Sequence, residues 1–257
     1  MNLFSRLNIR SAGRRLALAT VVAALLASPA RAGNWIGYMN WFQNSGVAPV
    51  GAKGAYVQGE FWGVPDLKTT VVTSNVGTII GDQLVLEPNY NTYTNSLGGN
   101  NGDRAYWTNS SDGGATAGPY GNKWMEANTF EETASIAIPS YTFQGTVTAN
   151  TLNGSLYSAE AFIKVLDPSL GYATVLNNRI GLPASGGFSL TSDLSGFQGK
   201  LLQVGFTMNG LNANIADAAT NGSVSVTVVP EPSTIASLAV AGVAVMASRL
   251  RRRRAAT

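Results

Sequence analysis

The sequence of 257 residues contains no cysteine and no histidine. Without cysteine the chain has no disulfide framework, no thiolate nucleophile and no cysteine-based metal site. Without histidine it lacks the usual general base at neutral pH and the commonest zinc ligand, and a Ser-His-Asp triad cannot form. A Gly-x-Ser-x-Gly motif is absent as well. The sequence therefore predicts that the protein is not an enzyme and that it requires no cofactor.

Charged residues are scarce, at 12% of the chain, and they are unevenly distributed. Ten of the 17 Lys and Arg lie in the two ends, five up to Arg31 and five from Arg249. The segment 33–229 holds seven Lys and Arg against 13 Asp and Glu, a net charge of −6. Such a segment has no electrostatic footprint for a phosphate backbone. The pI of 9.2 comes from the basic residues of the two ends. We therefore expect no nucleic-acid partner.

The first 32 residues have the layout of a secretory signal peptide. An arginine-rich segment ending at Arg15 precedes an apolar run over 16–27, and the small-x-small triplet Ala30-Arg31-Ala32 follows. Signal peptides place their basic region, apolar region and cleavage site in this order. We expect cleavage before Gly33, with cleavage after Ala30 as the alternative. An uncleaved N-terminal anchor is the competing interpretation.

The last 29 residues, 229–257, form a second targeting pattern. Pro230 and Pro232 lack an N–H and fix φ, so the segment around Glu231 predicts an exposed, extended hinge. An uncharged run over about 234–248 follows. As a helix of about 15 residues it would be roughly 22 Å long, which is short for a membrane span unless the bilayer thins and flanking arginines snorkel. A core helix followed by a basic tail is the alternative.

Five arginines close the chain and would keep this end on the cytoplasmic side of a membrane. They are Arg249, Arg251, Arg252, Arg253 and Arg254. The order of a Pro-Glu-Pro motif, a transmembrane segment and an arginine cluster resembles a PEP-CTERM sorting signal, and the resemblance is confined to this tail. It implies that Pro230, Glu231 and Pro232 are the recognition motif, and that the arginines retain the protein transiently in the inner membrane. It further implies processing by a signal peptidase and an exosortase-like protease, delivery to the cell surface or extracellular matrix, and extracellular polysaccharide as a partner.

Between the targeting ends, residues 33–228 predict an all-β body. Short β-branched or aromatic runs alternate with polar residues and are separated by Gly, Asn, Ser and Thr. In 223–228, for example, the valines share one face and the hydroxyls the other, as in half-buried antiparallel strands. The expected strands are Lys68–Ser74, Gln83–Glu87, Trp124–Phe130, Tyr141–Ala149, Ala159–Leu166, Gly187–Thr191, Leu201–Met208 and Gly222–Val229. This number of strands predicts a single β-sandwich, of jelly-roll type.

Residues 88–122 are rich in Asn, Gly, Ser and Tyr and predict a long loop. Aromatic residues also cluster at 34–42 and 56–62. An exposed Tyr or Trp beside amides and carboxylates can stack on a pyranose while its neighbours bind the hydroxyls. Because they lie in polar loop sequence, the candidates for a glycan platform are Tyr90, Tyr93, Tyr106 and Trp107. The alternative is that these rings belong to the core.

Other sites are weakly indicated. A glycosidase needs two carboxylates on opposite sides of a bond, but Glu131 and Glu132 are adjacent and would face opposite ways on a strand. We therefore expect Glu126, Glu131 and Glu132 to be surface or edge charges without a catalytic role. Structural Ca²⁺ could be bound, since sandwich loops offer oxygen ligands, but the sequence specifies no ligand set. The acidic candidates are Asp66, Asp82, Glu87, Asp103 and Asp112.

These observations favour an exported, membrane-tethered or surface-released protein with a structural or adhesive role in exopolysaccharide. A glycan binder resembling a carbohydrate-binding module is the alternative, and a secreted glycan hydrolase is the third hypothesis. Exposed aromatic rings along one groove would favour the binder. Two carboxylates facing each other across a cleft would favour the hydrolase.

Overall fold

The computed structural model describes residues 34–46, 51–74, 81–97, 101–108 and 120–228. The predicted signal peptide, with Ala30, Ala32 and Gly33, lies outside these ranges, as does the predicted sorting signal over 229–257. Both therefore stay predictions. Among the helices of the described ranges, none is long and apolar enough to cross a membrane.

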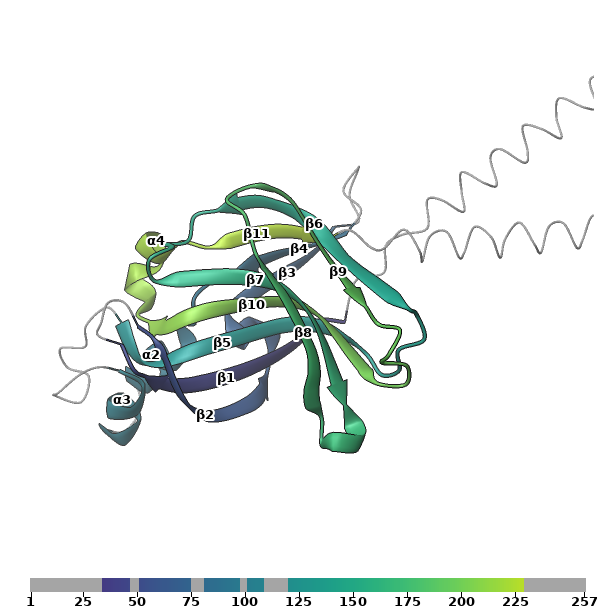
Figure 1. Cartoon of the computed structure of the whole chain (residues 1–257). Helices are drawn as coiled ribbons and strands as arrows, with labels where there is room; N and C mark the ends of the chain where they lie inside the picture. The colour runs from purple at the N-terminus through teal and green to yellow at the C-terminus, as the bar shows by residue number, and fades with distance from the viewer. Residues whose placement is uncertain (1–33, 47–50, 75–80, 98–100, 109–119, 229–257) are drawn as a thin grey trace, which may run out of the picture. The chain divides into compact units, whose positions relative to one another are not determined.

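Two antiparallel β-sheets pack against each other (Figure 1). The strands are β1 (Ile36–Asn44), β2 (Lys53–Trp62), β3 (Thr69–Ser74), β4 (Gly81–Leu86), β5 (Tyr120–Thr133), β6 (Ser140–Asn150), β7 (Tyr157–Asp167), β8 (Ala173–Gly181), β9 (Gly186–Asp193), β10 (Leu201–Ala213) and β11 (Val224–Val228). One sheet has the order β2-β1-β5-β10-β7-β8, and the other has the order β3-β4-β11-β6-β9. The predicted β-sandwich is confirmed at this level, and the finer jelly-roll assignment stays a prediction.

Each of the eight predicted strands overlaps an observed one, but β1, β2 and β8 were not predicted. β1 carries apolar side chains on both faces, because Met39 and Trp41 are buried on one side and Phe42 on the other. This arrangement hides the alternation that marks a half-buried strand. In β8 the polar sequence Asn177-Asn178-Arg179 concealed the strand.

The prediction of a loop over 88–122 is wrong for part of this segment. Two short helices, α2 (Asn91–Leu97) and α3 (Asn101–Trp107), occupy it, and β5 already begins at Tyr120. The remaining short elements are α4 (Ala218–Asn221) and the 3₁₀ turns η1 (Val64–Leu67), η2 (Pro168–Leu170) and η3 (Ile215–Asp217). The helices attach to the sheet through Asn212 of β10, whose side-chain amide donates to the Thr92 hydroxyl and to the Trp107 carbonyl, both at 2.9 Å.

The main core lies between the sheets. Phe206 of the six-stranded sheet contacts Phe143 and Phe188 of the five-stranded sheet, with ring centroids 5.2 and 5.7 Å apart. The valines Val224 and Val226 of β11 are buried against them, as the alternation of that strand predicts. β10 differs from an ordinary half-exposed strand because nearly all its residues are buried on both faces. The side of the six-stranded sheet that faces away from the core is therefore also covered by side chains.

Candidate functional site

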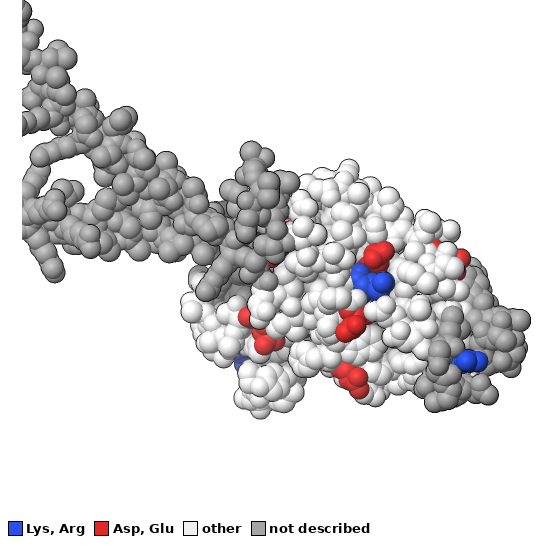
Figure 2. Space-filling view, turned by 180° about the vertical axis from the view of Figure 1, so that it is seen from behind, with Lys and Arg blue, Asp and Glu red and all other residues white. Residues whose placement is uncertain are grey.

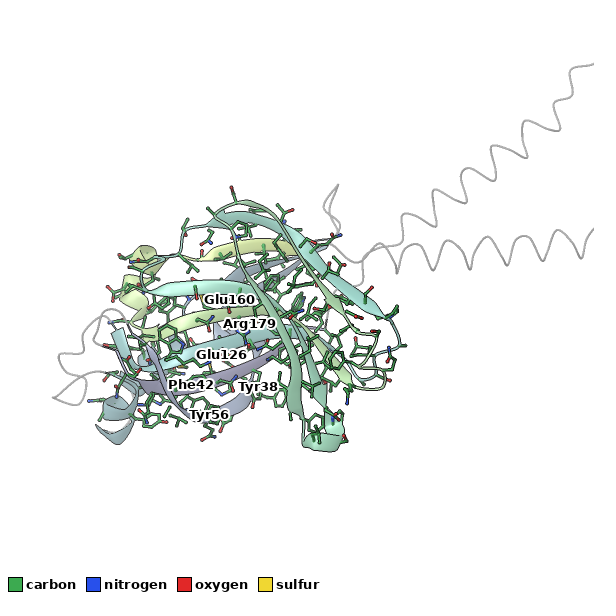
Figure 3. All side chains as sticks on the ribbon, in the orientation of Figure 1. Tyr38, Phe42, Tyr56, Glu126, Glu160 and Arg179 are labelled. Carbon is green, nitrogen blue, oxygen red and sulfur yellow. The ribbon has the colours of Figure 1, made fainter. Side chains whose placement is uncertain are left out.

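Alternate residues of the six-stranded sheet point away from the core and form a second face. On β5, Met125 and Ala127 belong to the core, so Glu126 and Asn128 lie on the other side of the strand. The strand registers place Asn40 of β1 and Asn209 of β10 opposite Glu126. Figure 3 shows this face toward the viewer, with Glu126, Arg179 and Glu160 close together and Tyr38, Phe42 and Tyr56 beside them.

Two ion pairs show how strongly this face is curved. Glu126 accepts from Lys53 of β2 at 2.6 Å and from Arg179 of β8 at 3.1 Å, and β2 and β8 are the two edge strands of the sheet. β8 and β5 are three strand spacings apart, which is roughly 14 Å in a flat sheet. In Figure 1, β8 passes in front of β10 and β5, and the contact between Arg179 and Glu126 shows that this edge curls over the face. We call this side of the six-stranded sheet the concave face.

Arg179 joins two carboxylates. Its second terminal nitrogen binds Glu160 of β7 at 3.1 Å, so one guanidinium holds both Glu126 and Glu160. Burial raises the pKa of Glu126, but the hydrogen bond from Lys53 and the charge of Arg179 outweigh burial and lower this pKa overall. Glu126 is therefore an ionised, paired carboxylate at neutral pH, and the prediction that it is a surface charge is wrong.

A groove of about 660 Å³ lies on the concave face beside this cluster. Its aromatic lining consists of Tyr38, Phe61, Phe130 and Tyr172. Phe61 of β2 and Tyr172 of the β7–β8 connection expose 70% and 60% of their surface, which is unusual for large rings that could pack inside. Tyr38 and Phe61 form an edge-to-face pair at 4.9 Å, and a second pair, Phe42 with Tyr56, lies next to it on the same two strands at 5.5 Å.

Polar groups of the groove are held in place by hydrogen bonds. The Asn128 amide donates to the Glu126 carbonyl at 3.0 Å and accepts from the Thr207 hydroxyl at 2.8 Å. Gln203 donates to Glu132 at 2.9 Å. The half-buried amide of Asn40, by contrast, makes no hydrogen bond to any other residue in the described part of the chain. The groove thus combines fixed polar groups with one amide whose donor and acceptor are free for a ligand.

The tight turn after β7 holds Tyr172 at the groove. Asp167 accepts from the Ser169 N–H at 2.9 Å and is paired with Lys200. The hydrogen bond from Lys200, followed by that from the Ser169 side chain, lowers the pKa of Asp167 to about 2. Tyr172 itself has a φ of +63°, a left-handed conformation that a non-glycine residue adopts at a cost of order 1 kcal/mol or more. Such strain at an exposed ring is typical of functional positions.

Lys164 of β7 also lines the groove. Its ammonium lies 4.8 Å from the centroid of the Phe162 ring. Gly205 of β10 leaves room for Phe130, which contacts Phe162 at 6.4 Å, because a Cβ on Gly205 would overlap the backbone of Thr129 and Phe130. The buried Phe130–Phe162 pair thus forms a small apolar floor under the charged groups.

The four aromatic residues proposed as a platform do not form one. Tyr90 and Tyr93 are buried, and burial raises the pKa of Tyr90 to about 12. Tyr106 is partly exposed, but its hydroxyl accepts from the Trp41 indole at 3.0 Å and its ring packs on Trp107. Predicting exposure for Tyr90 and Tyr93 was therefore wrong, and the core alternative holds for them. Tyr106 and Trp107 belong to an aromatic cluster with Trp41, separate from the residues that line the groove.

The carboxylates divide between the two faces of the sheet. Glu132 lines the groove, whereas the neighbouring Glu131 lies on the other side, where burial and then the charge of Asp82 raise its pKa. This division agrees with the alternation expected for adjacent strand residues. Asp82 accepts from the Trp35 indole at 2.8 Å. No group of three acidic residues within the described ranges could hold a metal ion, and Asp112 lies outside these ranges. Calcium binding stays a prediction without a ligand set.

Sequence reasoning missed most residues of the groove. Tyr38 and Phe61 lie in the two aromatic clusters noted near the N-terminus, but polar flanking sequence was taken as the sign of exposure, and these two lie in strands. Lys164 and Gln203 lie on strands that were predicted. Only their pairing across β7 and β10 brings them to one groove, and a single sequence carries no signal for that pairing.

No protein-family model matches this chain, and no curated protein matches it. A solved structure described as "Structural basis for the promiscuous specificity of the carbohydrate-binding modules from the beta-sandwich super family" aligns with a TM-score of 0.35 and 11% sequence identity. The alignment covers 79% of this chain and 86% of that chain. A similarity of this size carries no inference about function.

Proposed function

We propose that the body binds an extracellular glycan in the groove of the concave face, and that the protein is exported and sorted through a PEP-CTERM system. The observation that supports binding is the pair of exposed rings, Phe61 and Tyr172, that line one groove with hydrogen-bonded amides. Aromatic rings stack on the apolar face of a sugar, and amides and carboxylates bind its hydroxyls. The structural or adhesive role in exopolysaccharide would then be exercised through this groove.

The acidic groups support binding more than hydrolysis. Glu132 is the one carboxylate among the described residues that line the groove. Glu126 and Glu160 are bound to the same guanidinium instead of facing each other across the groove. A glycosidase places its two carboxylates on opposite sides of the scissile bond, and this arrangement does not.

Binding is tested with the full-length protein in detergent and the extracellular polysaccharide of its own host. Phe61→Ala and Tyr172→Ala should each weaken binding about ten- to a hundred-fold, because burying a large apolar side chain against a ligand contributes about 1.5–3 kcal/mol. Both rings are largely exposed, so thermal stability should change little. Leu170→Ala is the matched control, since Leu170 is equally exposed on the same turn but does not line the groove.

Two outcomes decide between the hypotheses. Saturable binding that both ring variants lose and Leu170→Ala keeps would establish glycan binding in this groove. An absence of binding by the wild-type protein would contradict the proposal and leave a structural role without direct glycan contact.

The sorting proposal is tested separately by fractionating cells. Replacement of Arg251, Arg252, Arg253 and Arg254 by Ser should let unprocessed protein leak or misorient, because these charges would hold the tail in the cytoplasm. Glu231→Ala should leave membrane insertion intact and block processing. If both variants fractionate and mature like the wild type, the sorting proposal is wrong.

A further inference from the structure

Lys164 carries the only positive charge among the described residues that line the groove. Its ammonium rests over the Phe162 ring. In the described part of the chain, no carboxylate lies at ion-pair distance from it. The other cations of the concave face are different, because Lys53 and Arg179 are both paired with Glu126. Lys164 is thus an unpaired charge among the residues that line a candidate binding site.

The environment of Lys164 disfavours its charge. Burial lowers the pKa of its amine to about 8, the charge of Arg179 and then that of Lys53 add to the effect, and Glu126 opposes it. A half-buried ammonium without a partner costs stability. Its retention in a groove is therefore more readily explained by a ligand than by folding, since perturbed ionisable groups concentrate at functional sites.

We propose, building on glycan binding by this groove, that the ligand is an acidic glycan and that Lys164 binds its carboxylate. The incoming carboxylate would give the ammonium the partner that the protein does not provide, and a charge-assisted hydrogen bond of this kind is stronger than a neutral one. The neighbouring sugar rings would stack on Phe61 or Tyr172.

The acidic residues near Lys164 are compatible with an anionic ligand. Glu132 lies on β5 and Lys164 on β7, and β10 lies between these two strands. Gln203 of β10 is paired with both positions and donates a hydrogen bond to Glu132. Lys53 and Arg179 together balance the charges of Glu126 and Glu160, so this ion-pair cluster has no net charge. The net charge at this end of the groove is therefore that of Lys164, and the Arg179 guanidinium of the balanced cluster lies 5.9 Å from the same Phe162 ring.

The test compares two forms of one polysaccharide. The extracellular polysaccharide of the host is used as isolated and after chemical reduction of its carboxyl groups to hydroxymethyl groups, which keeps the backbone but removes the charge. The full-length protein in detergent should bind the native form about ten-fold or more tightly than the reduced form, since a hydrogen bond to a charged group contributes about 1.5–3 kcal/mol. Binding of the native form should weaken with added salt.

Substitutions assign this preference to one side chain. Lys164→Gln should lose the preference for the native form, and Lys164→Arg should keep it. Lys68→Gln is the control for net charge, because Lys68 lies outside the groove. Binding of native polysaccharide should fall between pH 6.5 and 9 for the wild type, as the amine loses its proton, and should stay constant over this range for Lys164→Arg.

A further variant separates binding from folding. Lys164→Met removes the unpaired charge and should raise the melting temperature by about 2–4 °C while abolishing the preference for the native form. Equal binding of both polysaccharide forms by the wild type, or an unchanged preference in Lys164→Gln, would overturn the acidic assignment and leave glycan binding intact. Failure to bind either form would instead contradict the proposed function itself.

Discussion

The concave face of the six-stranded sheet and the outer face of the five-stranded sheet follow the same strand alternation but carry different side chains. The five-stranded sheet presents hydroxyls, such as Thr142 and Thr191, which share a hydrogen bond at 3.0 Å in solvent. The concave face presents paired and unpaired charges and exposed rings. A surface that needs only to be soluble resembles the first face. The second keeps energetically costly groups in place, and this difference supports the proposal that the concave face is the binding surface.

The side of the molecule turned away from the viewer in Figure 1 supports the same contrast. Where it is not covered by grey atoms, this side is mostly uncharged, with scattered acidic groups, some of which lie beside a basic group (Figure 2). The charge cluster of Lys53, Glu126, Arg179 and Glu160 belongs to the concave face.

The largest effect should come from breaking the ion-pair cluster. Arg179→Ala leaves Glu160 without its cation and Glu126 with Lys53 alone. We expect a loss of about 2–3 kcal/mol, below the roughly 3–5 kcal/mol of a fully buried pair, because Arg179 is partly exposed. Urea unfolding of the full-length protein measures it. Thr191→Ala on the other face should change stability by less than about 0.5 kcal/mol, and equal effects would remove the contrast between the faces.

A somewhat smaller effect is expected at the junction of the helices and the sheet. Asn212→Ala removes the hydrogen bonds to Thr92 and Trp107 and that from the Lys123 N–H. Leaving these buried groups unpaired should cost about 1–3 kcal/mol, measured by chemical denaturation. Glycan binding should not change, because α2 and α3 do not line the groove.

The control is Asn122→Ala. The Asn122 side chain makes long hydrogen bonds, at 3.4 Å, to the Ala105 and Tyr106 carbonyls. Loss of binding in Asn212→Ala would place the site at the helices.

The charge cluster should also make stability depend on acid. The pKa of Glu126 is lowered in the folded protein relative to its ordinary value of 4.5. Its contribution is thus complete above this value and is lost as pH falls through the lowered pKa. Melting temperatures between pH 6 and pH 3 should show a steeper decline for the wild type than for Glu126→Gln. Parallel curves would mean that the cluster does not stabilise the concave face.

The smallest effect is expected for the hydroxyl face. Replacing both Thr142 and Thr191 by Val removes the exposed hydrogen bond between them and retains β-branched side chains. Stability should stay within about 0.5 kcal/mol of the wild type, and affinity for the polysaccharide should be unchanged when measured by titration. A loss of affinity would show that the glycan contacts the five-stranded sheet.

Much of the fold could be predicted because period-two alternation is a local signal. The valines of β11 and the aromatic residues of β6 show it directly, and both lie where expected. β1 was missed because buried residues occupy both of its faces, with Phe42 on the concave side in contact with Lys53 and Tyr56. That second buried layer depends on sheet curvature, which no short window of sequence encodes.

The sequence predicted the residue types of the candidate site but not which residues form it. Aromatic rings beside amides were predicted to form a glycan platform, but Tyr90 and Tyr93 do not contribute to one because both rings are buried. Glu126 was treated as an ordinary surface charge, since its partners Lys53 and Arg179 are 73 and 53 residues away in the chain. Contacts of this range follow from strand order, not from spacing.

Hydrogen–deuterium exchange of the full-length protein, with and without the polysaccharide of its host, tests the central claim most directly. Edge strands have unpaired N–H groups and exchange readily, so β2 and β8 report on the concave face while β3 and β9 report on the other sheet. The account predicts that the glycan protects Lys53–Trp62 and Ala173–Gly181 and leaves Thr69–Ser74 and Gly186–Asp193 unchanged. Protection confined to β3 and β9 would contradict it.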